Sequence, residues 1–189
     1  MDSGKIIIIT APSGSGKTTL VKRLLQACPQ LSFSISACTR QPRANEQHGK
    51  DYYFYSEPDF RKLIDTDAFV EWEMVYTGKY YGTLRSELTR IWEAGHQPLV
   101  DIDVKGALAI QDAYPDNSLT IFIQAPSIEE LRQRLMLRGT ETLHSLDERV
   151  SKANFELSFA PQFDSIIIND DLDVATAELV QLVNDFISA

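Results

Sequence analysis

The chain has 189 residues, of which 43% are hydrophobic and 24% are charged, with a formal net charge of −9 at neutral pH. This length and hydrophobic content predict one globular domain with appended segments and exclude a disordered chain. The negative charge argues against nucleic acid or an anionic membrane surface as a partner. An anionic ligand must therefore be held by a local site.

The first residues lack the pattern of a signal peptide, and no apolar run approaches membrane-spanning length. A cytoplasmic protein is therefore expected. The two cysteines, Cys28 and Cys38, have no CxxC spacing and no neighbouring histidine cluster, which favours two reduced thiols over a metal site.

Residues 6–19 read IIIITAPSGSGKTT. Four consecutive isoleucines predict a central strand of a parallel sheet that is covered on both faces. A glycine loop follows, and then apolar residues at helical spacing: Leu20, Val21, Leu24 and Leu25. Strand, glycine loop and helix are the context that a phosphate-binding P-loop requires.

The residues of this loop suit a polyphosphate. Gly14 and Gly16 let backbone N–H groups approach the phosphates, and the helix N-terminus adds partial positive charge. Lys17 would reach the β- and γ-phosphates, and the Thr18 hydroxyl would bind Mg²⁺. The usual first glycine is replaced by Ala11, which fits there if its φ is negative.

The next segment, residues 38–82, is rich in Arg, Tyr, Gly and Glu. A short strand is expected just before it over residues 33–37, and another lies within it over residues 52–55. Arg40 and Arg43 lie on a loop, where they suit bidentate binding of a phosphate or are ordinary surface side chains.

Residues 69–75 alternate apolar with acidic side chains, which puts Glu71 and Glu73 on one face of a strand. By this pattern alone, Glu71 is a solvent-facing residue. Thr83 stands where an N-cap is expected before a helix.

Residues 98–103 predict another buried parallel strand. Asp101 and Asp103 lie near its carboxyl end, where open α/β sheets bind ligands. Two carboxylates there favour a metal or a ligand donor over solvation alone.

Residues 119–124 predict the next core strand, and Ser127 with Glu130 forms a capping box that opens a helix with Leu131 and Leu135 toward the core. Residues 139–147 are expected to be a mobile loop. A second capping box is expected from Ser145 and Glu148.

Three arginines flank this loop: Arg134, Arg138 and Arg149. They are either ordinary surface residues or part of a lid that brings positive charge to a transferring phosphoryl group. Residues 164–168 complete a sheet of about five parallel strands, and a C-terminal amphipathic helix follows with Val174, Leu179, Val183 and Phe186.

Six blocks of the sequence resemble those of guanylate kinases in order and spacing: APSGSGKTT, SISACTRQPRANEQHGKDYYF, FVEWEMVYTGKYYGT, LVDID, LRQRLMLRGTET and IINDDL. The resemblance covers essentially the whole chain and implies an α/β P-loop NTPase fold with a three-layer core, a small mixed GMP-binding subdomain and a helical lid. The implied boundaries within the single domain 1–189 are 1–37, 84–133 and 150–189 for the core, 38–83 for the subdomain and 134–149 for the lid.

The resemblance also implies the reaction, transfer of the γ-phosphoryl group of ATP to GMP in purine nucleotide metabolism, with Mg²⁺. The implied ATP-binding residues are Ala11, Pro12, Ser13, Gly14, Ser15, Gly16, Lys17, Thr18, Thr19, Arg134, Arg138 and Asn169. The implied GMP-binding residues are Ser36, Arg40, Arg43, Tyr52, Glu71, Tyr81, Gly82, Thr83 and Asp103. Thr18 and Asp101 are the implied metal-site residues, and Lys17, Arg138 and Arg149 the catalytic ones.

The chemistry of guanine supports GMP as the acceptor, because one carboxylate, here that of Glu71, can accept hydrogen bonds from both the N1–H and the N2–H₂ group. Two alternatives remain: a scaffold domain of this fold that binds peptides, and a P-loop kinase acting on another phosphorylated acceptor. GMP and dGMP are both expected acceptors, and no side-chain nucleophile is required.

Overall fold

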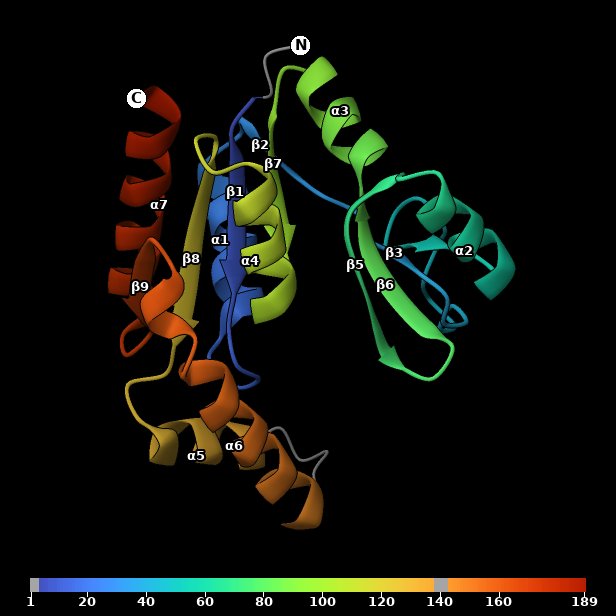
Figure 1. Ribbon diagram of the computed structural model, residues 1–189. Helices are drawn as coiled ribbons and strands as arrows, with labels where there is room; N and C mark the ends of the chain where they lie inside the picture. Colours follow the sequence, from blue (N-terminus) through green and yellow to red (C-terminus); the bar gives the residue numbers. More distant parts are fainter. Residues whose placement is uncertain (1–3, 138–142) are drawn as a thin grey trace.

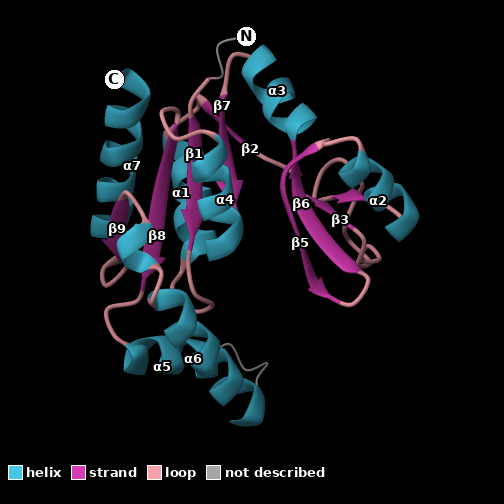
Figure 2. Cartoon of the chain, viewed as in Figure 1, coloured by secondary structure: helices cyan, strands magenta, loops and turns pink. Residues whose placement is uncertain are grey.

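The computed structural model describes residues 4–137 and 143–189, which contain two β-sheets. Figure 1 shows a sheet flanked by α1, α4 and α7, a second sheet with α2 beside it, and the pair α5 and α6 at one end of the first sheet. Figure 2 shows in the same view that α3 lies between the two sheets.

The first sheet has five strands, all parallel, in the order β2-β7-β1-β8-β9. They are β1 (Ile6–Thr10), β2 (Leu31–Phe33), β7 (Gln97–Asp101), β8 (Ser118–Gln124) and β9 (Ser165–Ile168). The four isoleucines of β1 are all 0% exposed. The predicted central strand and the five-stranded parallel sheet are thus confirmed.

Helices bury both faces of this sheet. On one face α1 (Lys17–Ala27) and α7 (Leu172–Ser188) pack against Ile7 and Ile9, and on the other α3 (Arg85–Glu93) and α4 (Val104–Ala113) pack against Ile6 and Ile8. In α7 the expected inward residue Val174 is 66% exposed, because its neighbour Ala175 takes the core position.

The second sheet has the order β4-β3-β6-β5 and carries α2 (Glu57–Asp65). Its strands are β3 (Ala37–Cys38), β4 (Tyr53–Phe54), β5 (Phe69–Tyr76) and β6 (Lys79–Leu84). The expectation of one strand over residues 33–37 is wrong, because the chain leaves the first sheet after Phe33 and enters the second at Ala37.

The helices α5 (Ile128–Leu137) and α6 (Leu143–Leu157) pack mainly on each other. Leu131 and Leu135 lie in this separate cluster, with Leu146 and Ala153, rather than in the main core as expected. Because helices of this length bury their apolar stripe wherever a partner helix lies, periodicity alone could not choose between these two surfaces.

The start of α5 is as predicted, since the Ser127 hydroxyl accepts a hydrogen bond from the Glu130 N–H at 3.0 Å. The prediction for α6 is wrong, because this helix already begins at Leu143 and residues 143–147 are helical rather than a loop. Residues 138–142 lie outside the described part. A short 3₁₀ helix, η1 (Ala160–Gln162), then leads to β9.

Among the described residues, none of the helices combines the length and the apolar character needed to cross a membrane. The boundaries expected for core, subdomain and lid stay a prediction.

Candidate active site

The loop between β1 and α1 forms a tight turn. Gly14 and Gly16 have φ values of 96° and 88°, which side chains with a Cβ rarely adopt. The Ser15 N–H donates to the Pro12 carbonyl at 3.2 Å. Residues 11–16 of the predicted P-loop therefore form a compact turn, and residues 17–19 are the first turn of α1.

Asn169, which follows the edge strand β9, holds this turn at the carboxyl end of the sheet. Its buried side-chain amide donates to the Ser15 carbonyl at 2.7 Å, and a Cβ on Gly16 would lie 2.2 Å from the same nitrogen. Arg134 donates to the Asn169 carbonyl at 2.9 Å. A cavity of about 220 Å³ beside them is lined by Gly16, Thr19, Arg134, Asn169, Asp170 and Leu172.

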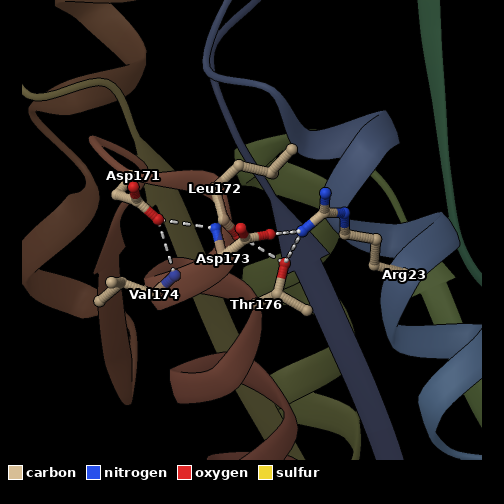
Figure 3. Close-up of polar contacts among 6 residues, drawn as sticks. All are labelled: Arg23, Asp171, Leu172, Asp173, Val174 and Thr176. Atoms are coloured by element: carbon tan, nitrogen blue, oxygen red, sulfur yellow. Dashed lines mark hydrogen bonds and ion pairs between the residues drawn. The ribbon is translucent and has the colours of Figure 1, made fainter.

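The segment after Asn169 is fixed to the P-loop helix. Figure 3 shows the Asp171 carboxylate accepting hydrogen bonds from the N–H groups of Asp173 and Val174, at 2.8 and 3.0 Å, which caps α7. Arg23 of α1 forms an ion pair with Asp173 and lies 3.4 Å from the Thr176 hydroxyl oxygen. These contacts fix α7, and with it the position of Asn169, relative to α1.

Lys17 and Asp101 meet at the carboxyl ends of β1 and β7, where they form an ion pair. Burial lowers the pKa of Lys17 to about 8, although the negative charges of Glu156 and Asp103 act in the opposite direction. Glu156 was not found from the sequence, but it lies three residues after Ala153 on the buried face of α6.

A cavity of about 320 Å³ opens between the two sheets beside this pair. Eight residues expected from the sequence line it: Lys17, Ser36, Tyr52, Glu71, Tyr81, Gly82, Asp101 and Asp103. Four further lining residues, Glu73, Val75, Tyr76 and Ile102, were not expected. The β5–β6 hairpin and the end of β7 thus face one another across a single pocket.

Glu71 and Thr83 lie opposite each other on β5 and β6. Glu71 Oε1 and Thr83 Oγ1 are buried and have no hydrogen-bond partner among the described residues. The pKa of Glu71 is raised to about 7, mainly by burial and also by the negative charges of Asp103 and Glu73, while the nearby Thr83 acts in the opposite direction. Buried polar oxygens without partners point to a ligand that supplies donors.

The expectation that Thr83 caps a helix is wrong, because it lies within β6 and the N-cap position of α3 is Leu84. Asp103 is instead the N-cap of α4: its Oδ1 accepts from the N–H groups of Lys105 and Gly106 at 3.0 and 2.9 Å. A Cβ on Gly106 would lie 2.4 Å from the Ile102 side chain and 3.2 Å from Glu71 Oε2, so this glycine leaves room chiefly for Ile102.

Arg40 is held in place by Glu46, which accepts two hydrogen bonds from its guanidinium at 2.5 and 2.7 Å. The guanidinium lies 4.6 Å from the centre of the Tyr52 ring. The hydrogen bonds from the Arg40 side chain, and next the one from the Arg43 backbone, lower the pKa of Glu46 to about 2. Arg43 is exposed, and its N–H donates to Glu46 at 2.8 Å. The sequence analysis did not identify Glu46, although an acidic residue so close in the sequence to two arginines is a signal that it pairs with them.

Arg149 of α6 reaches toward the P-loop, with its Nη1 3.4 Å from the Ser13 hydroxyl oxygen. Arg134 is paired with Glu130 at 2.8 Å. Arg138, expected from the sequence to be a catalytic and ATP-binding residue, lies outside the described residues.

A P-loop between a parallel strand and a helix, with a carboxylate at the end of the neighbouring strand, defines an α/β P-loop kinase fold, to which this chain adds a second sheet. The model of the family "Guanylate kinase" matches residues 3–186. The chain belongs to the guanylate kinase family, a family of nucleoside monophosphate kinases.

Two guanylate kinases are similar in sequence to this chain over nearly its full length. The guanylate kinase of Bacteroides fragilis is 46% identical over 183 residues, covering 97% of this chain and 90% of the relative. That of Porphyromonas gingivalis is 47% identical, covering 97% of this chain and 98% of the relative.

Two solved structures are also similar. The guanylate kinase from Anaplasma phagocytophilum has a TM-score of 0.75 at 30% identity, covering 97% of this chain and 86% of that one. Shikimate kinase from Bacteroides thetaiotaomicron has a TM-score of 0.50 at 15% identity, covering 98% and 99%, and shows likeness of fold alone.

Proposed function

We propose that this chain performs the reaction of its family, transfer of the γ-phosphoryl group of ATP to GMP to give ADP and GDP, in the pocket between its two sheets. One observation carries the choice of acceptor: Glu71, which lines this pocket with Lys17, and Thr83, its neighbour across β5 and β6, each carry a buried side-chain oxygen with no hydrogen-bond partner among the described residues.

Guanine suits these two oxygens because its N1–H and N2–H₂ groups are neighbouring donors, and an ionised carboxylate accepts both. Adenine presents a bare N1 acceptor at this position, which would face a carboxylate oxygen without a proton between them. A buried polar group left unpaired costs about 1–3 kcal/mol, so the same pocket disfavours AMP. The same pocket is also lined by Ser36, Gly82 and Asp103. We expect dGMP to be a second acceptor.

The GMP phosphate is assigned to Arg40, Arg43, Tyr52 and Tyr81. Arg40 is held by Glu46 and the Tyr52 ring, so its guanidinium is preorganised, whereas Arg43 is free to turn toward an incoming phosphate. The donor phosphates are assigned to the P-loop, and the adenine to the cavity beside Arg134 and Asn169.

Mg²⁺ fits the residues between the two substrates. Thr18 is an exposed hydroxyl in the first turn of α1, and the Asp101 carboxylate stands at the end of the adjacent strand, so both are hard oxygen donors beside the P-loop. When bound, the ion would neutralise charge on the β- and γ-phosphates. Thr18 and Asp101 would hold it, directly or through its water shell.

Transfer then requires positioning and charge neutralisation. An oxygen of the GMP phosphate attacks the γ-phosphorus of ATP, the bond from this phosphorus to the β,γ-bridging oxygen breaks, and ADP leaves with that electron pair. Lys17 exchanges Asp101 for the phosphates, whose charge favours its protonated form. Arg149, whose Nη1 lies 3.4 Å from the Ser13 hydroxyl oxygen of the P-loop, is assigned to neutralising the transferring phosphoryl group, and the sequence assigns the same role to Arg138.

An ADP-release assay with GMP, dGMP, AMP and UMP, and with no acceptor, tests the proposal. We expect rapid release with GMP, slower release with AMP and UMP, and little without an acceptor. Equal rates with AMP and GMP would refute the guanine assignment. No ADP release from the folded protein with any nucleotide would favour the alternative of a peptide-binding scaffold of this fold. The cytoplasmic location expected from the sequence stays a prediction.

A further inference from the structure

Glu87 is a buried carboxylate outside the substrate pocket. It lies in the first turn of α3, it is 2% exposed, and the pocket between the sheets does not include it. A buried charge without compensation is strongly unfavourable, so its surroundings must explain it.

Four donors from three parts of the chain converge on this carboxylate. The Ile35 N–H and the Tyr53 hydroxyl donate to it at 3.0 and 2.8 Å. Arg90, one turn further along α3, donates from Nε and Nη2, both at 2.8 Å. Burial alone would raise the pKa of Glu87, but the bonds from Arg90, Ile35 and Tyr53 lower it by more, so its pKa lies below the usual value.

These donors lie where the chain passes between the two sheets. Ile35 belongs to the first crossing, from Phe33 in β2 to Ala37 in β3. The second crossing is α3 itself, because β6 ends at Leu84 and α3 begins at the next residue. One carboxylate therefore ties the two crossings together.

The helix that carries Glu87 is fixed to the first sheet. Leu88 and Trp92 pack in the same core cluster as Ile6 and Ile8, and the Trp92 indole N–H donates to the Lys5 carbonyl at 3.2 Å. Tyr53, in contrast, belongs to β4 of the second sheet. The Glu87–Tyr53 hydrogen bond thus joins one sheet to the other.

The partners of Glu87 are chain neighbours of proposed substrate contacts. Ile35 precedes Ser36, which lines the guanine end of the pocket, and Tyr53 follows Tyr52, which stacks on Arg40 at the phosphate end. A rotation of the second sheet about the crossings would move both ends of bound GMP relative to Lys17.

We infer that Glu87, held by Arg90, is a positioning residue: it holds together the two crossings about which the second sheet moves, and so sets where bound GMP lies relative to the P-loop. This rests on the proposed function. Glu87 acts through Ile35 and Tyr53, and it touches neither nucleotide.

The test compares Tyr53→Phe, which removes one donor and keeps the ring, with Glu87→Gln, which removes the charge that Arg90 pairs with. Lys62→Gln is the control, because it breaks an exposed pair with Asp59 of the same i,i+3 spacing in the helix of the second sheet. For each variant we would measure kcat, KM for GMP, the Kd of ATP without GMP, and Tm.

We expect kcat/KM for GMP to fall about tenfold in Tyr53→Phe and further in Glu87→Gln, because misplacing reactants by about 1 Å costs up to about a hundredfold. The Kd of ATP should stay unchanged, since its site lies on the first sheet. Lys62→Gln should keep the wild-type values.

Wild-type kcat and KM for GMP in Tyr53→Phe would overturn the inference, whatever happens to its Tm, and would leave Glu87 a role in stability alone. If Glu87→Gln does not fold, Tyr53→Phe decides. A wild-type protein that does not phosphorylate GMP would refute the proposed function instead, so the two failures are distinguishable.

Discussion

Lys17, at the start of the P-loop helix, forms an ion pair with Asp101, the last residue of the neighbouring strand β7. The two residues are 84 positions apart in the sequence and meet because β1 and β7 are adjacent and parallel. The pair gives the lysine a counter-charge, which the phosphates of ATP would replace.

We expect Lys17→Ala to lose turnover by at least about 10²–10³-fold, because electrostatic stabilisation of a transition state by one positioned group is of this size. Lys22→Ala, which removes an exposed lysine of the same helix, is the control. Circular dichroism should show unchanged helix content in both. Near-wild-type turnover in folded Lys17→Ala would contradict the catalytic assignment.

Changing Glu71 to Gln should weaken GMP binding by about 1.5–3 kcal/mol, because one acceptor oxygen becomes an NH₂ donor that opposes guanine. Glu73→Gln is the matched control on the same face of β5, where Glu73 pairs with Lys105 at 3.5 Å, and its effect should be smaller. Calorimetry measures both affinities. Equal GMP affinity in wild type and Glu71→Gln would make Glu71 an ordinary strand residue.

The pH dependence of guanine binding follows from the same residue. Burial is the main cause that raises the pKa of Glu71 from 4.5 to about 7, and the ionised form is the one that accepts both guanine donors. Binding should therefore be strongest above pH 7 and weaken as the pH falls through 7.

Guanosine is the probe for this measurement because it has no phosphate that titrates in this range. Its Kd, measured between pH 5.5 and 8.5, should rise toward tenfold per pH unit on the acid side, about 1.4 kcal/mol for each unit. In Glu71→Gln the profile should be flat. A flat profile in the wild-type protein would exclude Glu71 as the titrating acceptor.

Gly16→Ala should damage ATP binding beyond the cost of backbone strain. Its φ of 88° costs a side-chain residue about 1–2 kcal/mol, and the new Cβ would also displace the Asn169 amide from the Ser15 carbonyl. Gly95→Ala is the control: φ is 79° and a Cβ there would meet nothing within 4 Å. Both variants should lose stability in thermal unfolding, and KM for ATP should rise in Gly16→Ala alone.

Motion of the α5–α6 pair and of the second sheet should accompany substrate binding. The apolar cluster of α5 and α6 is separate from the clusters on the two faces of the first sheet, which permits movement as a unit. We expect amides in α5, α6 and residues 38–82 to exchange more slowly in a complex with a bisubstrate analogue than in the free protein. The same protection in both states would contradict closure.

Several parts of the fold and site were determined by local sequence. The isoleucine run of β1 can be buried only in the centre of a sheet covered on both faces, and the GSGKTT turn needs its glycines and lysine at fixed spacing. The alternation of residues 69–75 put Glu71 and Glu73 on one strand face. These features depend on neighbours in the chain, so the sequence predicted them.

Other features depended on distant parts of the chain. Thr83 is equally suited to cap a helix or to lie on a strand, and only its pairing with Glu71 across β5 and β6 decided that it shares a face of the second sheet with Glu71. The apolar helix face that carries Leu131 and Leu135 was predicted correctly from the sequence. Only the tertiary structure decided that this face packs on α6 rather than on the sheet.

The network at Glu87 depended on tertiary structure in the same way. In the sequence Glu87 is one acidic residue of an amphipathic helix. Its four donors come from residues 35, 53 and 90, which meet only when both sheets are assembled. Local sequence thus determined the strands, the turns and the chemistry of each side chain. Long-range packing decided which side chains share a pocket, because burial and hydrogen bonding between distant segments set how close those side chains lie.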